Sequence, residues 1–246
     1  MHRFFVIDDN GIIRLRDDDV RHAQRVLRLE PGDEIEAVFE AQRWKAAILT
    51  AGETVQIELK EKLEDTEPGS DITLFQGLPK AEKMEWIIQK GTELGINRFC
   101  PVLMERSVPM PDRKNAARKQ ERWRTIATEA VKQCGRSRIP EVDEPVGLKE
   151  ALQALRNTDV LLVPWEGSTA GKSPAIHDVL KPLQEQNGLS VGILIGPEGG
   201  ISETEIQWLQ SNANATAVTL GPRILRTETA AIAATVLVLG ALGEMQ

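Results

Sequence analysis

From residue 72 onward, short apolar runs alternate with longer stretches that have helical periodicity. The first pair is a strand predicted at 72–76 and a helix predicted at 80–94, whose apolar residues recur at helical spacing along one face. Repeated strand–helix units predict an α/β fold with a mostly parallel sheet, and ligands are expected beyond the carboxyl ends of its strands. Further strands are predicted at 99–104, 160–163, 191–196 and 216–221, and further helices at 115–134, 148–156, 203–211 and 228–242.

The first 66 residues have the pattern of a small all-β unit instead. Short alternating strands are separated by turn residues such as Asn10-Gly11 and Pro31-Gly32, and one helix is predicted at 18–29. This pattern predicts a β-barrel or β-sandwich. Polar and turn-forming residues at 64–70 predict a linker, so we expect an N-terminal domain at 1–68 and a C-terminal domain at 71–246.

The charge is unevenly distributed along the chain. The net charge is −7, yet residues 80–140 carry 14 basic and seven acidic side chains. This basic block is either a solvated helical face or a binding surface for a polyanion. Two cysteines and three histidines without paired spacing favour a reducing cytoplasm and no metal site. The N-terminus has no secretory signal, and the longest apolar stretch, 230–243, is too short to span a membrane and predicts a buried helix.

One loop resembles a nucleotide-binding P-loop. Gly167 is followed by Gly171, Lys172 and Ser173 after a predicted strand. A P-loop has four residues between its first glycine and the Gly-Lys pair, whereas this loop has three, and Pro174 follows at once. We therefore prefer an ordinary loop and keep nucleotide hydrolysis as an alternative.

A second loop combines glycines with a helix start. The strand at 191–196 leads into Gly199 and Gly200, and Ser202 with Glu205 forms a capping box that predicts a helix from Glu203. The glycines would let a ligand approach the backbone closely, although a tight turn alone would also explain them. The spacing does not match the dinucleotide-binding GxGxxG pattern.

A third loop carries positive charge. Thr227 is expected to cap the last helix, which leaves Arg223 and Arg226 just ahead of its N-terminus. Two arginines beside a helix N-terminus and a glycine turn predict a pocket for an anionic group.

Segments 195–200 and 220–230 resemble the C-terminal signature of the SPOUT methyltransferases. Segments 76–96, 105–107 and 129–136 also resemble this family, so the similarity covers nearly the whole chain. The resemblance implies a C-terminal trefoil knot, S-adenosyl-L-methionine as cofactor, a homodimer and methylation of uridine N3 in small-subunit ribosomal RNA. It also implies that the cofactor-binding residues are Ile195, Gly196, Glu198, Gly199, Gly200, Leu220, Gly221, Ile224, Leu225 and Arg226.

The same resemblance extends to segments 2–5 and 22–28, which are similar to the PUA-like RNA-binding domain of the family. RNA-binding residues would then be Arg3, Arg25, Arg28, Lys80, Lys83 and Arg136, and they would contact phosphates rather than bases. The apolar last helix, although it could simply be buried, would form part of the dimer interface.

In such an enzyme we expect Arg226, and secondarily Arg223, to stabilise the anion that forms when uridine N3 loses its proton. Glu198 is a candidate base, but it could equally accept hydrogen bonds within the turn. An RNA-binding assembly factor without methyl transfer is the non-enzymatic alternative.

Overall fold

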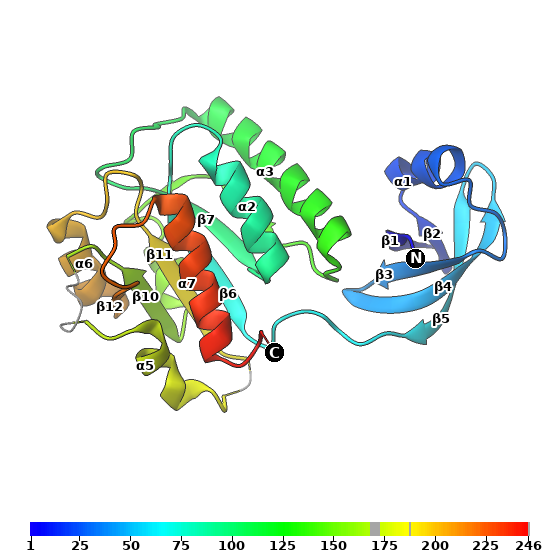
Figure 1. Cartoon of the computed structure of the whole chain (residues 1–246). Helices are drawn as coiled ribbons and strands as arrows, with labels where there is room; N and C mark the ends of the chain where they lie inside the picture. The colour runs from blue at the N-terminus through cyan, green and yellow to red at the C-terminus, as the bar shows by residue number, and fades with distance from the viewer. Residues whose placement is uncertain (168–172, 187, 246) are drawn as a thin grey trace. The chain divides into compact units, whose positions relative to one another are not determined.

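The computed structural model describes residues 1–167, 173–186 and 188–245, and the chain divides into two compact units (Figure 1). The first unit comprises Met1–Glu67 and Val131–Arg138, and the second comprises Pro68–Ala130 and Ile139–Gln246. The segment Val131–Arg138, which includes the last turn of a helix, was not anticipated from the sequence.

The first unit contains a closed five-stranded barrel in the order β1-β2-β5-β4-β3. β1 and β3 pair in parallel and the other neighbours are antiparallel. Leu15, Ile35 and Ile48 are buried in its core. Of the two predicted architectures, barrel and sandwich, the structure therefore has the barrel. The strands are β1 (Arg3–Asp9), β2 (Ile12–Leu15), β3 (Glu34–Phe39), β4 (Gln42–Ala51) and β5 (Val55–Lys62).

The helical segment of the first unit is shorter than predicted. It consists of α1 (Asp17–Arg21) and a π-helical turn, η1 (His22–Val26). Arg28 has a positive φ of 54°, which a helix does not accommodate, so the segment ends before the predicted Leu29.

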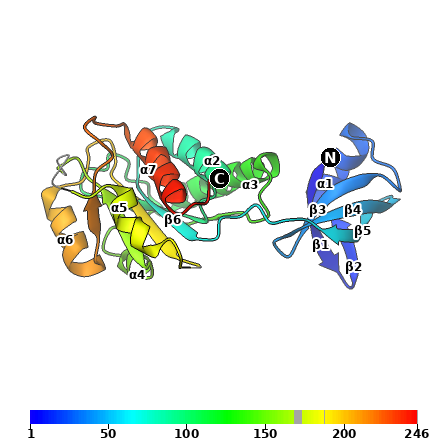
Figure 2. The same cartoon turned by 60° about the horizontal axis from the view of Figure 1, so that its bottom comes forward.

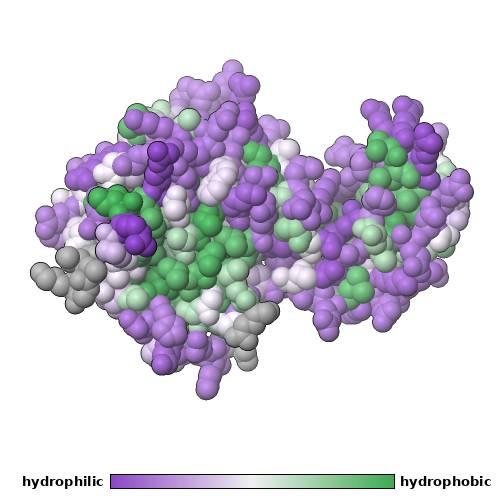
Figure 3. Space-filling model, in the orientation of Figure 1, coloured by the Kyte–Doolittle hydropathy of each residue, from purple (hydrophilic) through white to green (hydrophobic). Residues whose placement is uncertain are grey.

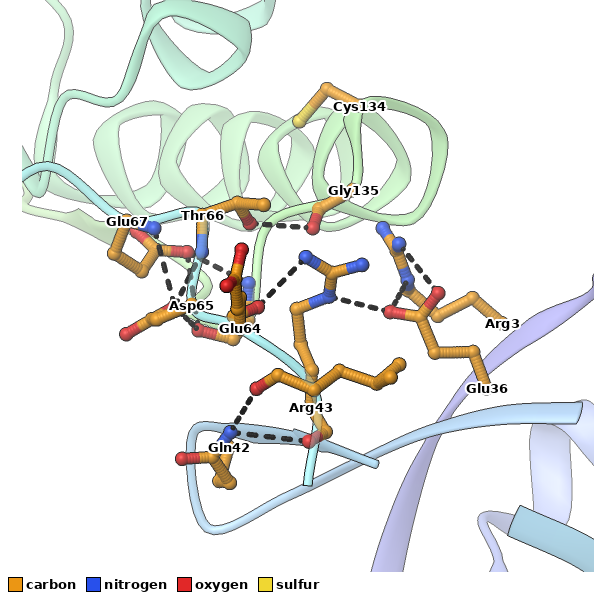
Figure 4. A network of polar contacts seen from close by, with 12 residues as sticks. Arg3, Glu36, Gln42, Arg43, Glu64, Asp65, Thr66, Glu67, Cys134 and Gly135 are labelled. Carbon is orange, nitrogen blue, oxygen red and sulfur yellow. Dashed lines mark hydrogen bonds and ion pairs between the residues drawn. The ribbon is translucent and has the colours of Figure 1, made fainter. Parts of the chain in front are cut away.

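A cluster of ion pairs organises the first unit (Figure 4). Arg3 and Arg43 both point toward Glu36, whose Oε1 accepts hydrogen bonds of 2.8 and 2.7 Å from their Nε atoms. Arg43 also donates to the carbonyl of Glu64, at the beginning of the linker. The pKa of Glu36 is lowered, because burial would raise it but the two arginine hydrogen bonds outweigh burial.

A second buried pair fixes the segment Val131–Arg138 within this unit. Glu67 Oε2 accepts a 2.6 Å hydrogen bond from Arg136 Nη2, and the two side chains are 2% and 4% exposed. The other carboxylate oxygen of Glu67 accepts from the backbone N–H groups of Ser137 and Arg138, and Thr66 donates to the carbonyl of Gly135. Residues 64–67 of the predicted linker are therefore a structured part of the first unit.

The second unit contains a seven-stranded parallel sheet in the order β12-β10-β11-β6-β7-β8, with β9 pairing β7. This confirms the predicted parallel α/β fold. The strands are β6 (Asp71–Gly77), β7 (Arg98–Leu103), β8 (Glu141–Val142), β9 (Val146–Gly147), β10 (Val160–Pro164), β11 (Ser190–Ile195) and β12 (Thr216–Val218).

Helices cover both faces of this sheet. Ile72 and Leu74 of β6 lie in one core with α2, α3, α5 and α7, whereas Phe75 points into a second core with α4 and α6. α4 and α6 lie on the opposite side of the sheet from α7 (Figure 2). The helices are α2 (Lys83–Leu94), α3 (Arg113–Cys134), α4 (Leu152–Arg156), α5 (Ile176–Leu180), the 3-10 turn η2 (Lys181–Leu183), α6 (Glu203–Ala213) and α7 (Thr227–Ala241).

Element boundaries differ from the prediction where local backbone geometry decides them. α2 begins three residues late because Ala81 has a positive φ of 54°. β12 ends at Val218, so the loop before α7 is longer than expected. The two-residue strands β8 and β9 are too short to give a recognisable period, and they were not predicted.

Candidate functional site

Three loops at the carboxyl edge of the parallel sheet surround a pocket of about 620 Å³. They follow β10, β11 and β12, which are neighbours in the sheet, so residues distant in sequence meet at one edge. The volume is typical of small-molecule sites. The lining residues are Lys83 of α2, 164–166 after β10, 195–198, 200 and 201 after β11, 219–227 after β12, and Ala230 of α7.

The loop after β11 has the predicted helix start. Ser202 Oγ accepts a hydrogen bond from the backbone N–H of Glu205, and Glu205 Oε2 accepts one from the backbone N–H of Ser202. This capping box is confirmed, and α6 begins at Glu203 as expected.

The two glycines of this loop face protein side chains. A Cβ on Gly199 would lie 2.8 Å from the Cβ of Arg106, and a Cβ on Gly200 would collide with the carboxylate of Glu166. Gly199 is also the one member of the predicted cofactor-binding set that does not line the pocket. The close approach of Arg106, in the loop after β7, therefore accounts for a glycine at position 199, and contact of this residue with the cofactor stays a prediction.

Glu198 is held by donors from the loop before α2 and from the first residue of that helix. Its carboxylate accepts hydrogen bonds from the backbone N–H of Lys80 at 3.0 Å and from Lys83 Nζ at 2.9 Å. Burial would raise the pKa of Glu198, but these hydrogen bonds outweigh it and lower the pKa. This geometry favours the acceptor role over the role of a base.

The loop after β12 presents two free cations. Arg223 and Arg226 line the pocket, are exposed, and make no hydrogen bond or ion pair within the part of the chain that the structure describes. Arg226, rather than Thr227, occupies the N-cap position of α7, and its side chain makes no capping bond. The prediction that Thr227 caps this helix is wrong.

Thr227 instead connects two strand ends beneath the pocket. Its hydroxyl donates to the carbonyl of Gly196 at 2.6 Å and accepts from Gln76 Nε2 at 2.8 Å. Gln76 is fully buried at the end of β6. A chain of neutral hydrogen bonds thus fixes the start of α7 against the loop after β11.

The predicted RNA-binding residues have different environments. Arg136 is 3% exposed and paired with Glu67, so the prediction that it contacts RNA is wrong. Arg3 is occupied by Glu36, and Lys83 lies in the pocket between Glu198 and Glu228. The remaining predicted residues, Arg25, Arg28 and Lys80, are exposed.

Sequence reasoning missed the contribution of the loop after β10. Trp165 lines the pocket and donates from its indole N–H to the carbonyl of Ile201, and Glu166 lines the pocket beside Gly200. Their position at the end of a predicted strand was the available signal. Most of the P-loop-like segment that follows, 168–172, lies outside the described residues.

The described residues contain neither a metal-binding cluster nor a membrane-spanning helix. No group of three or more His, Cys, Asp or Glu side chains among them could hold a metal ion. None of the helices in these ranges combines the length and apolar character needed to cross a membrane.

Comparison with known proteins links both units to RNA methyltransferases. The family described as RNA methyltransferase domain matches residues 66–239, and the RNA methyltransferase PUA domain matches residues 15–60. Ribosomal RNA small subunit methyltransferase E of Bacillus subtilis is 35% identical, and the alignment covers 94% of this chain and 93% of that protein.

Two solved structures with a bound ligand are similar over the whole chain. Ribosomal RNA small subunit methyltransferase E from Neisseria gonorrhoeae, bound to S-adenosyl methionine, is 28% identical with a TM-score of 0.77, covering 98% of this chain and 97% of that one. A putative methyltransferase from Legionella pneumophila in complex with the cofactor SAM is 31% identical with a TM-score of 0.75, covering 97% of each chain.

Proposed function

Because the chain belongs to the RNA methyltransferase family, and within it to ribosomal RNA small subunit methyltransferase E, we propose that it methylates N3 of a uridine in 16S ribosomal RNA with S-adenosylmethionine. The observation that carries the proposal is the pocket at the carboxyl edge of the sheet, with two arginines on its rim that have no partner among the described residues. A ribosomal RNA substrate also implies a cytoplasmic location.

The lining of the pocket fits S-adenosylmethionine. Ile195, Leu220 and Leu225 supply apolar surface for an adenine ring, and the space beside the Cα of Gly221 is open to a ligand. Charged side chains of both signs also line the pocket, which suits a cofactor that carries a carboxylate, an ammonium and a sulfonium. When bound, S-adenosylmethionine supplies a methyl group that is already activated by the sulfonium.

The chemical demand on the protein is to stabilise the uridine anion. N3 becomes nucleophilic when its proton leaves, and the negative charge spreads onto the flanking carbonyl oxygens. Arg226, with Arg223 beside it, provides guanidinium donors that no other described group occupies. Glu198 keeps the acceptor role described above, so the arginines carry the electrostatic part of catalysis.

Binding of RNA would use the exposed cations outside the pocket. Lys80 lies in the loop after β6, and Arg25 and Arg28 lie in and after η1 of the barrel unit. As phosphate contacts they would position the RNA without reading its sequence. This set replaces the six residues expected from the resemblance, since three of those have partners in the structure.

We also propose a homodimer that uses α7. Figure 3 shows apolar surface over this helix, to which Val236 and Leu237 contribute with 37% and 47% exposure. Ile224, in the adjoining loop, is 88% exposed. A self-associating surface would cover these side chains and exclude water from the pocket rim. Leu237→Asp should convert the dimer to a monomer in sedimentation velocity, and an unchanged mass would contradict the proposal.

The trefoil knot implied by the resemblance belongs to the same proposal, supported by the convergence of three loops on one pocket.

The decisive experiment combines calorimetry with a transfer assay. S-adenosylmethionine should bind and ATP should not, and labelled methyl groups should appear as N3-methyluridine in digests of small-subunit ribosomal RNA. RNA binding without transfer would support the assembly-factor alternative, and ATP binding would support the hydrolase alternative.

A further inference from the structure

Glu166 is a pocket residue that lies outside the set of site residues predicted from the sequence. It follows β10 by two residues, lines the pocket and is exposed to it. Its carboxylate lies against Gly200, where a side chain would collide with it. Gly200 also has a positive φ of 74°, so both its backbone and its missing Cβ are adapted to a glycine.

The charges around the pocket fall into two groups. Lys83 and Glu198 neutralise each other through a 2.9 Å ion pair. Glu166, Arg223 and Arg226 make no hydrogen bond or ion pair with any described residue. Within the described residues, the pocket therefore offers a ligand two cations from one loop and one carboxylate from another that have no protein partner.

We propose that Glu166 binds the cofactor by accepting hydrogen bonds from its donors. Gly200, because it has no side chain, leaves the space in which this carboxylate lies. S-adenosylmethionine carries two kinds of donor that suit a carboxylate: the neighbouring hydroxyls of the ribose and the ammonium of the methionyl group. The inference rests on the proposed function, because it assigns a residue to the cofactor of that reaction.

The donors of the cofactor need an acceptor that the two arginines cannot supply. Arg223 and Arg226 can pair with a carboxylate or with the uridine anion, but guanidinium groups cannot accept hydrogen bonds. Glu198 is already occupied by Lys80 and Lys83. Among the described carboxylates that line the pocket with no protein partner, Glu166 is the one that remains.

Calorimetry on Glu166→Gln tests the proposal directly. Loss of a charge-assisted hydrogen bond should weaken Kd for S-adenosylmethionine by about 10- to 100-fold. Glu203→Gln is the matched control, because Glu203 is an exposed carboxylate near the same turn that does not line the pocket. An unchanged Kd for Glu166→Gln, or an equal loss in Glu203→Gln, would overturn the proposal.

Two smaller ligands identify the donor. S-adenosylhomocysteine and 5′-methylthioadenosine both keep the ribose, but only the former has the amino-acid group. An equal loss for both ligands in Glu166→Gln would assign the carboxylate to the ribose hydroxyls, and a loss confined to S-adenosylhomocysteine would assign it to the ammonium. No loss for either ligand would count against this role of Glu166.

A double mutant tests whether Gly200 acts through Glu166. If Gly200 acts by leaving space for the Glu166 carboxylate, Gly200→Ala should weaken S-adenosylmethionine binding in the parent protein. The same substitution should have much less effect on this affinity in the Glu166→Ala background. Equal effects in both backgrounds would show that Gly200 acts independently of Glu166, through its backbone conformation or through the ligand. These outcomes are distinct from failure of the proposed function, in which the parent protein would not bind S-adenosylmethionine at all.

Discussion

In the first unit, Arg136 is buried against Glu67, whereas in the pocket of the second unit Arg223 and Arg226 are exposed and unpaired within the described residues. The same side chain serves opposite purposes in these two regions. A paired, buried guanidinium holds segments of chain together and is unavailable to a ligand, whereas an unpaired one at a pocket rim keeps its donors for a substrate. The presence of a partner, more than the residue type, separates structural from functional arginines.

The largest effect should come from breaking the buried pair. Arg136→Ala leaves the carboxylate of Glu67 buried without its partner, so the free energy of unfolding should fall by about 3–5 kcal/mol. Urea denaturation followed by circular dichroism would measure it. Arg138→Ala is the control, because the Arg138 side chain is exposed. A loss no greater than that of the control would remove the distinction between the two regions.

In the pocket, Arg226→Ala should act on catalysis with little effect on folding. Removal of one preorganised donor should lower kcat by about 10²–10³, with a much smaller change in KM for RNA. Arg226→Lys should recover only part of the rate, because an ammonium lacks the planar donor pair. The rate of the alanine variant should rise with pH as more uridine ionises. A normal single-turnover rate with weakened cofactor binding would make Arg226 a cofactor ligand instead.

The hydrogen-bond chain through Thr227 is buried like the Arg136–Glu67 pair, but it is neutral and lies beside the pocket. Thr227→Val preserves the shape but removes the hydroxyl between Gln76 and Gly196, so the free energy of unfolding should fall by about 1–3 kcal/mol. Thr227→Ser should restore most of it. Equal stabilities of the valine and serine variants would show that the hydroxyl is not needed.

The exposed cations should have a smaller effect, visible only in binding. Replacement of Lys80, Arg25 or Arg28 by Ala should each reduce the salt dependence of RNA binding, expressed as the slope of log K against log salt concentration, by about one unit. Lys181→Ala provides an exposed control outside the basic block. If the slope does not change, these residues belong to a solvated surface.

The smallest effect should be the pH dependence that Glu36 confers on stability. Arg3 and Arg43 lower its pKa below the usual 4.5, so its contribution is complete above that pH and is lost as pH falls through the lower, folded-state value. Glu36→Gln should therefore flatten the stability profile in this acidic range. An unchanged profile in acid denaturation would show that other carboxylates dominate.

The sequence predicted most of the fold and two of the three pocket loops. Parallel strands and helices leave periodic apolar patterns, and glycines with arginines at strand exits mark a ligand site. Pairings between distant residues leave no such pattern: Glu67 and Arg136 are far apart in the chain, so a buried structural arginine was taken for an RNA contact. Glu166 was missed for the same reason, since only the fold brings it to Gly200. The glycines were predicted to let a ligand approach the backbone, and in the structure Arg106 and Glu166 lie against them.

The placement of Val131–Arg138 in the first unit also bears on how this protein can evolve. An RNA-binding module made of one continuous segment can be gained, lost or exchanged by a single recombination event. Here, an exchange limited to residues 1–67 would separate Glu67 from Arg136 and Asp19 from Lys132. A foreign barrel would therefore be accepted only if the end of α3 changed with it, which ties the inheritance of the barrel to that of the helix.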